Sequence, residues 1–213
     1  GRHFCAGIDF SMVEELRRDF LTHAEGRRQE WLRSRVLELQ DCFSAFERCS
    51  KPVIAAVDGA CVGGGIDLIT ACDIRYATTT SHFCIKEIDL GIVADIGTIQ
   101  RLPSIVGEGI ARELTYTARS IDGAEAHRIG LVNHVFADKA ALIQAAMELA
   151  QTIAAKSPLA IRNTKRTFNH ARDNTVADGL AYVATLNAGI LFSADAQESM
   201  MAALQGRSPV FED

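Results

Sequence analysis

The sequence predicts an α/β fold, with a core of short strands and helices followed by a C-terminal helical module. Three observations support this prediction. Short apolar runs of strand composition alternate with helical patterns through the first two-thirds of the chain. A glycine cluster at 59–65 predicts a tight turn between a strand and a helix. The last third of the chain is mostly helical in pattern, which is typical of a separate helical layer or module.

A long amphipathic helix is predicted over residues 28–49. Charged residues separate apolar side chains that recur at steps of three and four, namely Leu32, Val36, Leu39, Phe43 and Phe46. The dipeptide Lys51-Pro52 ends this helix, because proline lacks the backbone N–H that a helix interior needs. The apolar run 53–57 then predicts a fully buried strand.

Shorter elements follow the glycine cluster. The first of them are a helix and two strands, predicted at 66–72, 74–76 and 83–85. A loop then leads to a helical turn that is expected to end at Leu102-Pro103. Later helix starts are indicated by the capping residues Asp122, Ser157 and Ser193. This order assigns residues 1–136 to the α/β core and residues 137–213 to a helical, oligomerisation region.

The composition limits the classes of protein to consider. A chain of 213 residues with 48% apolar and 23% charged residues fits one soluble globular core. The longest apolar runs are far too short to span a bilayer, so no membrane segment is expected. A formal net charge of -5 argues against a general nucleic-acid binder, which usually carries a basic surplus. No nucleic-acid partner is therefore expected.

The cysteine and histidine patterns predict neither a metal site nor disulfides. None of the six cysteines forms a C-x-x-C pair, and the six histidines show no metal-ligand spacing. Reduced thiols in an intracellular protein are the simplest interpretation. The sequence begins without an initiator Met, signal peptide or presequence, and it ends without an S-K-L address. We expect a cytoplasmic protein if the source is bacterial, and a mitochondrial or peroxisomal one if it is eukaryotic.

The candidate catalytic residues are three carboxylates in one short stretch, Asp67, Glu87 and Asp95. Acids held in apolar pockets near other acids have raised and separated pKa values, which suits them to move protons near neutral pH. The alternatives are structural. Asp67 would cap a helix or pair locally, and Glu87 would pair with Lys86 or an arginine. Asp95 would cap a helix that starts near Gly97.

Backbone N–H groups complete the candidate site. The cluster Gly63-Gly64-Gly65 opens a helix with unobstructed N–H groups, a setting that binds an anion or a developing oxyanion. Near the N-terminus, Gly7 permits close backbone approach, so that the Ile8 N–H would face the Gly64 N–H across a pocket. Each such donor contributes about 3 kcal/mol to stabilising an enolate oxygen in the transition state. The alternative is a tight strand-to-helix turn with no ligand.

These motifs resemble those of the crotonase superfamily, which contains enoyl-CoA hydratases and isomerases. The similarity covers essentially the whole chain, including F-C-A-G-I-D at 4–9, K-P-V-I-A-A-V-D-G-A-C-V-G-G-G-I-D-L at 51–68, A-C-D-I-R-Y-A at 71–77 and G-T-I-Q-R-L-P at 97–103. The resemblance implies a ClpP-like spiral of ββα units, with the family's N-terminal strands missing from this sequence. Because those strands help to bind the CoA nucleotide, the resemblance assigns only part of the CoA site.

The acids indicate a subfamily. Enoyl-CoA hydratases normally carry Glu at the Asp67 position and Gly at the Asp95 position, whereas the set in this chain is similar to that of Δ3,5-Δ2,4-dienoyl-CoA isomerases. By resemblance, Asp95 acts as base and Glu87 as acid, and Asp67 assists in the pocket. Ile8 and Gly64 would supply the oxyanion-hole N–H groups. The substrate-binding residues implied by the resemblance are Ala6, Gly7, Ile8, Gly63 and Gly64.

The resemblance implies an isomerase that converts 3,5-dienoyl-CoA to 2,4-dienoyl-CoA in unsaturated fatty-acid β-oxidation. A proton leaves C2, an enolate forms, and a proton is added at C6. CoA is part of the substrate, so no metal or redox cofactor is expected. Relatives usually form trimers or pairs of trimers, which implies a homotrimer or hexamer. The alternatives are an enoyl-CoA hydratase and a non-catalytic homologue that binds a protein, or RNA through the arginines at 17, 18, 27, 28, 33 and 35.

Overall fold

The structure is a computed structural model that describes residues 1–212, and it divides into two compact units. The first unit contains Gly1–Arg48 and Val53–Ile143, and the second contains Cys49–Pro52 and the residues from Gln144 onward. All strands among the described residues lie in the first unit, and the regular elements of the second are helices.

Two three-stranded sheets form the centre of the first unit. One has the order β1-β3-β6, with strands at Ile54–Val57, Ile74–Thr78 and His134–Phe136. The other has the order β2-β4-β5, with strands at Ala60–Val62, His82–Cys84 and Ile121–Asp122. β1 pairs in parallel with β3, and β2 pairs in parallel with β4. The consecutive strands β1 and β2 therefore lie beside β3 and β4, the next two strands in the chain.

Helices follow each pair of strands in the first unit. α3 (Gly64–Thr70) follows β2, and the 3-10 helix η1 (Glu87–Leu90) and α4 (Thr98–Val106) follow β4. α5 (Glu108–Thr117) comes next, and α6 (Gly123–Arg128) follows β5. Two strands followed by helix form one turn of a spiral, so the α/β fold class and the ββα spiral expected from the sequence are confirmed.

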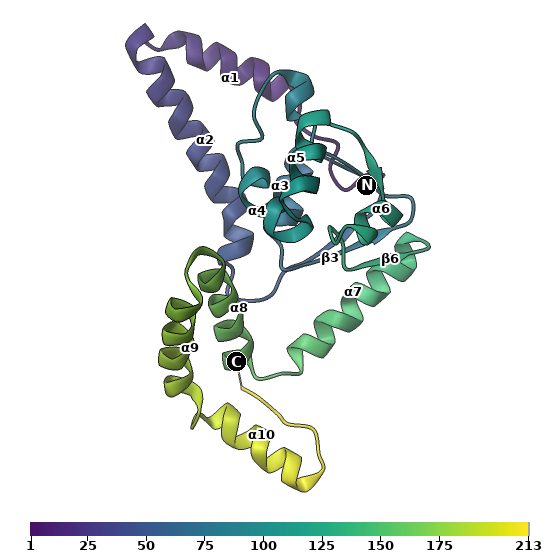
Figure 1. The fold of residues 1–213 in the computed structure, drawn as a ribbon, viewed down its shortest axis with the longest axis vertical. Helices are drawn as coiled ribbons and strands as arrows, with labels where there is room; N and C mark the ends of the chain where they lie inside the picture. The colour runs from purple at the N-terminus through teal and green to yellow at the C-terminus, as the bar shows by residue number, and fades with distance from the viewer. Residues whose placement is uncertain (213) are drawn as a thin grey trace. The chain divides into compact units, whose positions relative to one another are not determined.

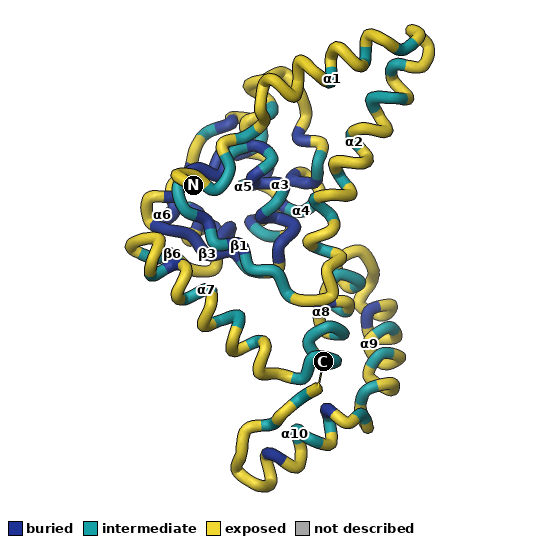
Figure 2. Tube along the Cα trace, turned by 180° about the vertical axis from the view of Figure 1, so that it is seen from behind, coloured by how far each residue is buried: buried dark blue, intermediate teal, exposed yellow. Residues whose placement is uncertain are grey.

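The apolar core lies in the strands and in the helices that follow them. Figure 2 shows the buried positions concentrated in β1, β3 and α3 to α5. One prediction for β1 is wrong, because the strand is not fully buried. Ala55 and Val57 are buried, whereas Ile54 and Ala56 are half-buried, since successive side chains point to opposite faces of a strand.

α1 (Phe10–Thr22) and α2 (Glu25–Arg48) contain no buried residue and extend away from the sheets of the same unit (Figures 1 and 2). α2 confirms the long helix predicted over 28–49, and Leu32, Val36 and Phe43 of the predicted apolar face are half-buried, but the prediction is wrong for the other two residues of that face. Leu39 and Phe46 are 41% and 40% exposed, whereas polar side chains of α2 are half-buried. The reason is that these polar side chains bond to α4 and to the turn before it.

One element was not predicted and one prediction needs correction. The sequence analysis gave no helix at α1, although Asp9 caps it by accepting a hydrogen bond from the Ser11 N–H at 2.9 Å. The helical turn expected to end at Pro103 instead continues as α4 to Val106. Pro103 lies inside α4 and has no N–H to donate to the carbonyl of Ile99, so the helix continues through it with one backbone bond fewer.

Of the helices near the C-terminus, α8 (Pro158–Asp173) and α10 (Ala194–Gln205) begin where the capping residues Ser157 and Ser193 predict. α7 (Lys139–Ala154) precedes α8, and α9 (Val176–Ile190) comes between α8 and α10 in the chain. Side-chain oxygens of Ser157 and Ser193 accept hydrogen bonds from N–H groups in the first turns of α8 and α10.

Over residues 1–212, no single helix is long and apolar enough to cross a membrane. Only the pair α9 and α10 has the required length and apolar character together, and that pair is bent by 75°.

Candidate active site

The glycine turn between β2 and α3 forms the base of the candidate site. Gly63 has a φ of +54°, a conformation that side chains disfavour, and its N–H donates to the Cys84 carbonyl at 3.0 Å. This bond ties the start of α3 to the end of β4. The Gly64 N–H begins α3 and donates to no acceptor within residues 1–212. The turn therefore presents a free donor beside β4.

The N-terminal segment lies against the same turn. The Cys5 N–H donates to the Ala60 carbonyl at 2.9 Å, and the Cys5 carbonyl accepts from the Val62 N–H at 3.0 Å. The next residues are thereby led past the glycines, and the Gly7 Cα lies 3.8 Å from where a Cβ on Gly63 would stand. The Ile8 N–H, like that of Gly64, has no acceptor among the described residues. The predicted pair of donor segments is thus brought together.

Glu87 begins η1, three residues after the end of β4 at Cys84, and its carboxylate faces the glycine turn. Its Oε1 lies 3.2 Å from where a Cβ on Gly63 would stand. Its Oε2 is buried and accepts no hydrogen bond from residues 1–212. Burial raises the pKa of Glu87, and the negative charges of Asp67 and Asp95 raise it further. The structural alternative that Glu87 pairs with Lys86 is wrong, because Lys86 pairs with Asp89 instead.

Asp67 lies in α3 and is only 1% exposed. Its Oδ1 accepts two hydrogen bonds from Thr98, one from the backbone N–H and one from Oγ1, both at 2.7 Å. Burial raises the pKa of Asp67, the Thr98 bonds lower it, and the nearby charge of Asp95 raises it. Since Thr98 is the first residue of α4, Asp67 also caps a helix, but one that is distant in sequence rather than local.

Asp95 lies on the exposed turn between η1 and α4. No residue among 1–212 donates a hydrogen bond to its carboxylate, whereas its backbone carbonyl accepts one from Gln40 Nε2 at 2.6 Å. The alternative that Asp95 caps α4 is wrong, because Gly97 is the N-cap and no side chain of the cap bonds there. The Asp95 carboxylate is therefore accessible to a ligand.

The structure brings the three predicted acids into one electrostatic group. The charges of Asp67 and Asp95 act on Glu87, and the charge of Asp95 acts on Asp67. One acid is buried and hydrogen-bonded, one is half-buried with an unpartnered oxygen, and one is exposed. Acids in such different environments are suited to different protonation states, as proton transfer between two positions requires.

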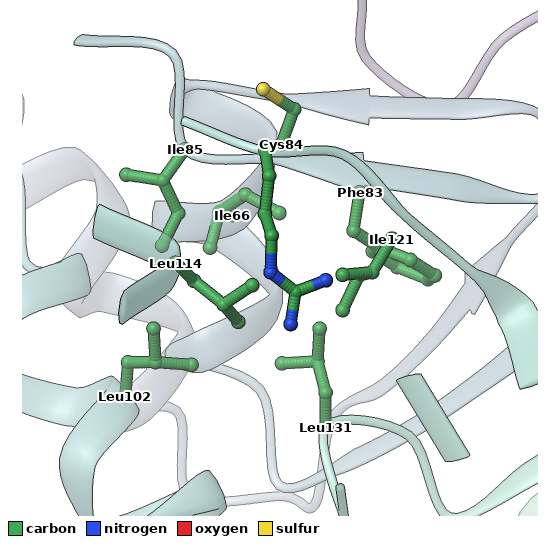
Figure 3. A pocket seen from close by; sticks show the side chains of 9 residues that line it. Ile66, Phe83, Cys84, Ile85, Leu102, Leu114, Ile121 and Leu131 are labelled. Carbon is green, nitrogen blue, oxygen red and sulfur yellow. The ribbon is translucent and has the colours of Figure 1, made fainter. Parts of the chain in front are cut away.

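The core next to the acids is closely packed around a cavity of about 10 Å³. Figure 3 shows the apolar side chains that surround it, among them Ile66, Phe83, Ile85, Leu102, Leu114, Ile121 and Leu131. Ile66 directly precedes Asp67, and Ile85 lies two residues before Glu87. Packing at this density leaves little room for movement, so it fixes the backbone that carries both acids.

Comparison with known proteins identifies the family. The family model described as enoyl-CoA hydratase/isomerase matches residues 1–213. The chain belongs to the enoyl-CoA hydratase/isomerase family. The crotonase resemblance seen in the sequence is therefore confirmed, and the chain shares its fold with solved structures of the family.

Relatives within the family agree with the subfamily indicated by the acids. The chain is 47% identical over 212 residues to the peroxisomal Δ3,5-Δ2,4-dienoyl-CoA isomerase of Arabidopsis thaliana, covering 99% of the chain and 76% of the plant protein. It is 43% identical over 211 residues to the mitochondrial Δ3,5-Δ2,4-dienoyl-CoA isomerase of Homo sapiens, covering 97% of the chain. The chain spans 63% of the human protein's length.

A solved enoyl-CoA hydratase from Polaromonas sp. JS666 has the same fold. It superposes with a TM-score of 0.87 at 28% sequence identity, covering 100% of the chain and 79% of the hydratase.

Three residues that contact the site were missed in the sequence. Thr98 binds Asp67, Gln40 binds the Asp95 carbonyl, and Arg101 lies close enough for its charge to lower the pKa of Asp67. Thr98 and Arg101 belong to the family-like motif G-T-I-Q-R-L-P, which was the only available signal for them. Gln40 lies in no motif, and its role depends on how α2 packs.

Proposed function

We propose that this chain is a Δ3,5-Δ2,4-dienoyl-CoA isomerase acting in unsaturated fatty-acid β-oxidation. The observation that carries the proposal is the electrostatic group of Asp67, Glu87 and Asp95 beside the free N–H groups of Ile8 and Gly64. The relatives named as isomerases, at 41–47% identity, support it.

The reaction moves one proton from the chain to the substrate and one from the substrate to the chain. Asp95 takes the C2 proton of the 3,5-dienoyl thioester, and the electron pair of that bond moves to the thioester oxygen as an enolate. The N–H groups of Ile8 and Gly64 stabilise this oxyanion. The enolate then collapses as Glu87 gives its proton to C6, which leaves the double bonds at C2 and C4. Proton exchange with solvent resets the two acids.

The environments of the acids support these roles. A raised pKa keeps Glu87 protonated at higher pH, as a proton donor must be. The exposed Asp95 carboxylate has no competing donor among residues 1–212, as a proton acceptor requires. Asp67 assists through its charge, which raises the pKa of Glu87, and through its bonds to Thr98.

The proposed substrate is an acyl-CoA thioester bound by the segments that flank the free N–H groups. Ala6, Gly7 and Ile8 form one segment, and Gly63 and Gly64 form the other. The acids and N–H groups are sufficient for the proposed proton transfers, so we propose no further cofactor. We also propose a homotrimer or hexamer, with a peroxisomal or mitochondrial location if the source is eukaryotic, in line with the relatives.

Hydration of a 2-enoyl-CoA is the second candidate, favoured by the fold shared with enoyl-CoA hydratases. A hydratase holds a water molecule between two acids. In this chain Asp67 is one methylene shorter than glutamate, and its Oδ1 already accepts two hydrogen bonds from Thr98. The geometry therefore favours isomerisation over hydration.

An Asp95→Asn variant tests the proposal. We expect turnover of 3,5-dienoyl-CoA to fall by about a hundredfold to ten-thousandfold, because asparagine cannot take the C2 proton. Binding of an acyl-CoA, measured by calorimetry, should change little. Asp89→Asn is the matched control, because Asp89 lies on the same segment and pairs with Lys86. Unchanged turnover in Asp95→Asn would contradict the assigned base.

A further inference from the structure

One face of α2 contacts the segments that carry the candidate site. Gln40, Phe43, Ser44 and Glu47 follow each other at steps of three, one and three residues, so they share one side of the helix. All four are half-buried in a helix that has no fully buried residue. We call these four residues the α2 contact face.

Gln40 holds the backbone of the proposed base. Its Nε2 donates to the Asp95 carbonyl at 2.6 Å, across 55 positions of sequence. Asp95 is exposed between the buried residues Ala94 and Gly97, and its carboxylate receives no donor from residues 1–212. The position of this carboxylate therefore depends on the backbone, and Gln40 is the side chain that bonds to the backbone at Asp95 itself.

Glu47 and Ser44 hold the other end of the same turn. Arg101 of α4 donates from Nε to Glu47 Oε2 at 2.8 Å and from a terminal nitrogen to Ser44 Oγ at 2.9 Å. The Arg101 guanidinium packs directly on Gly97, because a Cβ there would overlap it. The turn is thus bonded to α2 at Asp95. At Gly97 it is covered by the Arg101 side chain, which α2 holds in place.

The same face also reaches the glycine turn. The Phe43 ring lies 3.7 Å from where a Cβ on Gly64 would stand. Gly64 is one of the two residues whose free N–H groups would bind the enolate oxygen. The α2 contact face therefore contacts both the proposed base segment and one of the proposed oxyanion-binding segments.

We propose that the α2 contact face positions the catalytic turn, with Gln40 as a positioning residue for the Asp95 base. This inference rests on the proposed function, because Asp95 is the base only in that reaction. Gln40 does not touch the reacting atoms. It fixes where the Asp95 carboxylate stands relative to C2, and small displacements of a catalytic group lower the rate strongly.

A Gln40→Leu variant, compared with Gln29→Leu, tests the proposal. Gln29 is exposed on the same helix, and its side chain makes no hydrogen bond within residues 1–212. The two variants therefore carry the same chemical change, but only Gln40→Leu removes a bond. In deuterated water, removal of the C2 proton of 3,5-dienoyl-CoA reports on Asp95, and exchange at C6 of 2,4-dienoyl-CoA reports on Glu87. We expect Gln40→Leu to slow C2 exchange by about tenfold to a hundredfold, with C6 exchange and KM near the values of the unmodified protein.

A second measurement does not depend on activity. Amide hydrogen exchange over residues 95–98 should be faster in Gln40→Leu than in Gln29→Leu, because the turn loses its bond to α2. Equal amide exchange in the two variants, or equal loss of C2 and C6 exchange, would overturn the positioning role. If the unmodified protein exchanges neither proton, the proposed function fails, and the amide exchange still decides whether Gln40 holds the turn.

Discussion

The segment from β1 to α4 and the helix pair α1 and α2 belong to the same unit, but they are held in different ways. The first segment contains most of the buried apolar core, including Ile66 and Phe83. Its acids lie close in sequence to buried core residues. The second contains no buried residue and contacts the site largely through polar side chains of α2. The core therefore supplies the chemical groups, and α2 contributes to their placement.

This difference has consequences for substitutions. Changes to the glycine turn or the acids should alter chemistry or backbone conformation directly. Changes on α2 should act through the position of the turn that carries Asp95. Four predictions separate these effects, and the largest concerns an acid of the core segment.

Glu87→Gln should have the largest effect. Turnover of 3,5-dienoyl-CoA should fall by about a hundredfold to ten-thousandfold, because the amide cannot donate a proton to C6. Exchange of the C2 proton with solvent should continue, since Asp95 and the N–H groups are intact. Nuclear magnetic resonance of the substrate in deuterated water measures both. If turnover and C2 exchange are both unchanged, Glu87 has only a structural role.

A Gly→Ala substitution should lower the unfolding free energy in the glycine turn and raise it in α2. Gly63→Ala should cost about 1–3 kcal/mol of unfolding free energy, because Gly63 has a φ of +54°. The added methyl would also press on Glu87 Oε1 and lower activity. Gly26→Ala in α2 meets nothing within 4 Å and should stabilise the helix by up to about 1 kcal/mol. Urea unfolding compares the two, and a Gly63→Ala protein as stable as the parent would contradict the strained turn.

Arg101→Gln should destabilise the protein more than the loss of an exposed ion pair does. Arg101 and Glu47 are 12% and 15% exposed, whereas Arg112 and Glu108, paired within α5, are 59% and 64% exposed. We expect a cost of about 1–3 kcal/mol for Arg101→Gln and of less than about 1 kcal/mol for Arg112→Gln. Similar thermal unfolding of the two variants would mean that the bonds to α2 contribute little.

Asp67→Asn should give the smallest effect, a change in pH dependence. Glu87 must be protonated to act as acid, so turnover should decrease as pH rises through its raised pKa. The negative charge of Asp67 is one cause of that raised pKa. Asparagine keeps an oxygen for the Thr98 donors but removes the charge, so the decrease should begin at lower pH. A pH–rate profile that does not move would show that Asp67 exerts no charge on Glu87.

Much of the chain outside α1 and α2 was predictable because local patterns determine it. The apolar runs, the glycine turn and the caps at Asp122 and Ser157 act over a few residues, and the structure has each of them. The three acids were recognisable because they lie within family motifs. The ββα spiral came from the same resemblance and is confirmed by the shared fold.

The docking of α2 was only partly predictable, because apolar periodicity indicates Phe43 but none of the polar residues that bond to the site. Leu39 and Phe46 were expected inside and are exposed, while Gln40 and Glu47 make the contacts. Hydrogen bonds across more than 50 positions leave no periodic signal in a sequence. The same holds for Thr98, whose bond to Asp67 replaces the local pairing that the sequence suggested.

An ultraviolet assay of the purified protein with a 3,5-dienoyl-CoA, beside a 2-enoyl-CoA control, tests the central claim most directly. The proposed chemistry predicts rapid growth of the 2,4-dienoyl chromophore and little hydration of the control. Hydration of the control without dienoyl isomerisation would contradict it, and would mean that Asp67, despite its bonds to Thr98, still helps to hold a water molecule. Inactivity toward both substrates would contradict both the isomerase and the hydratase.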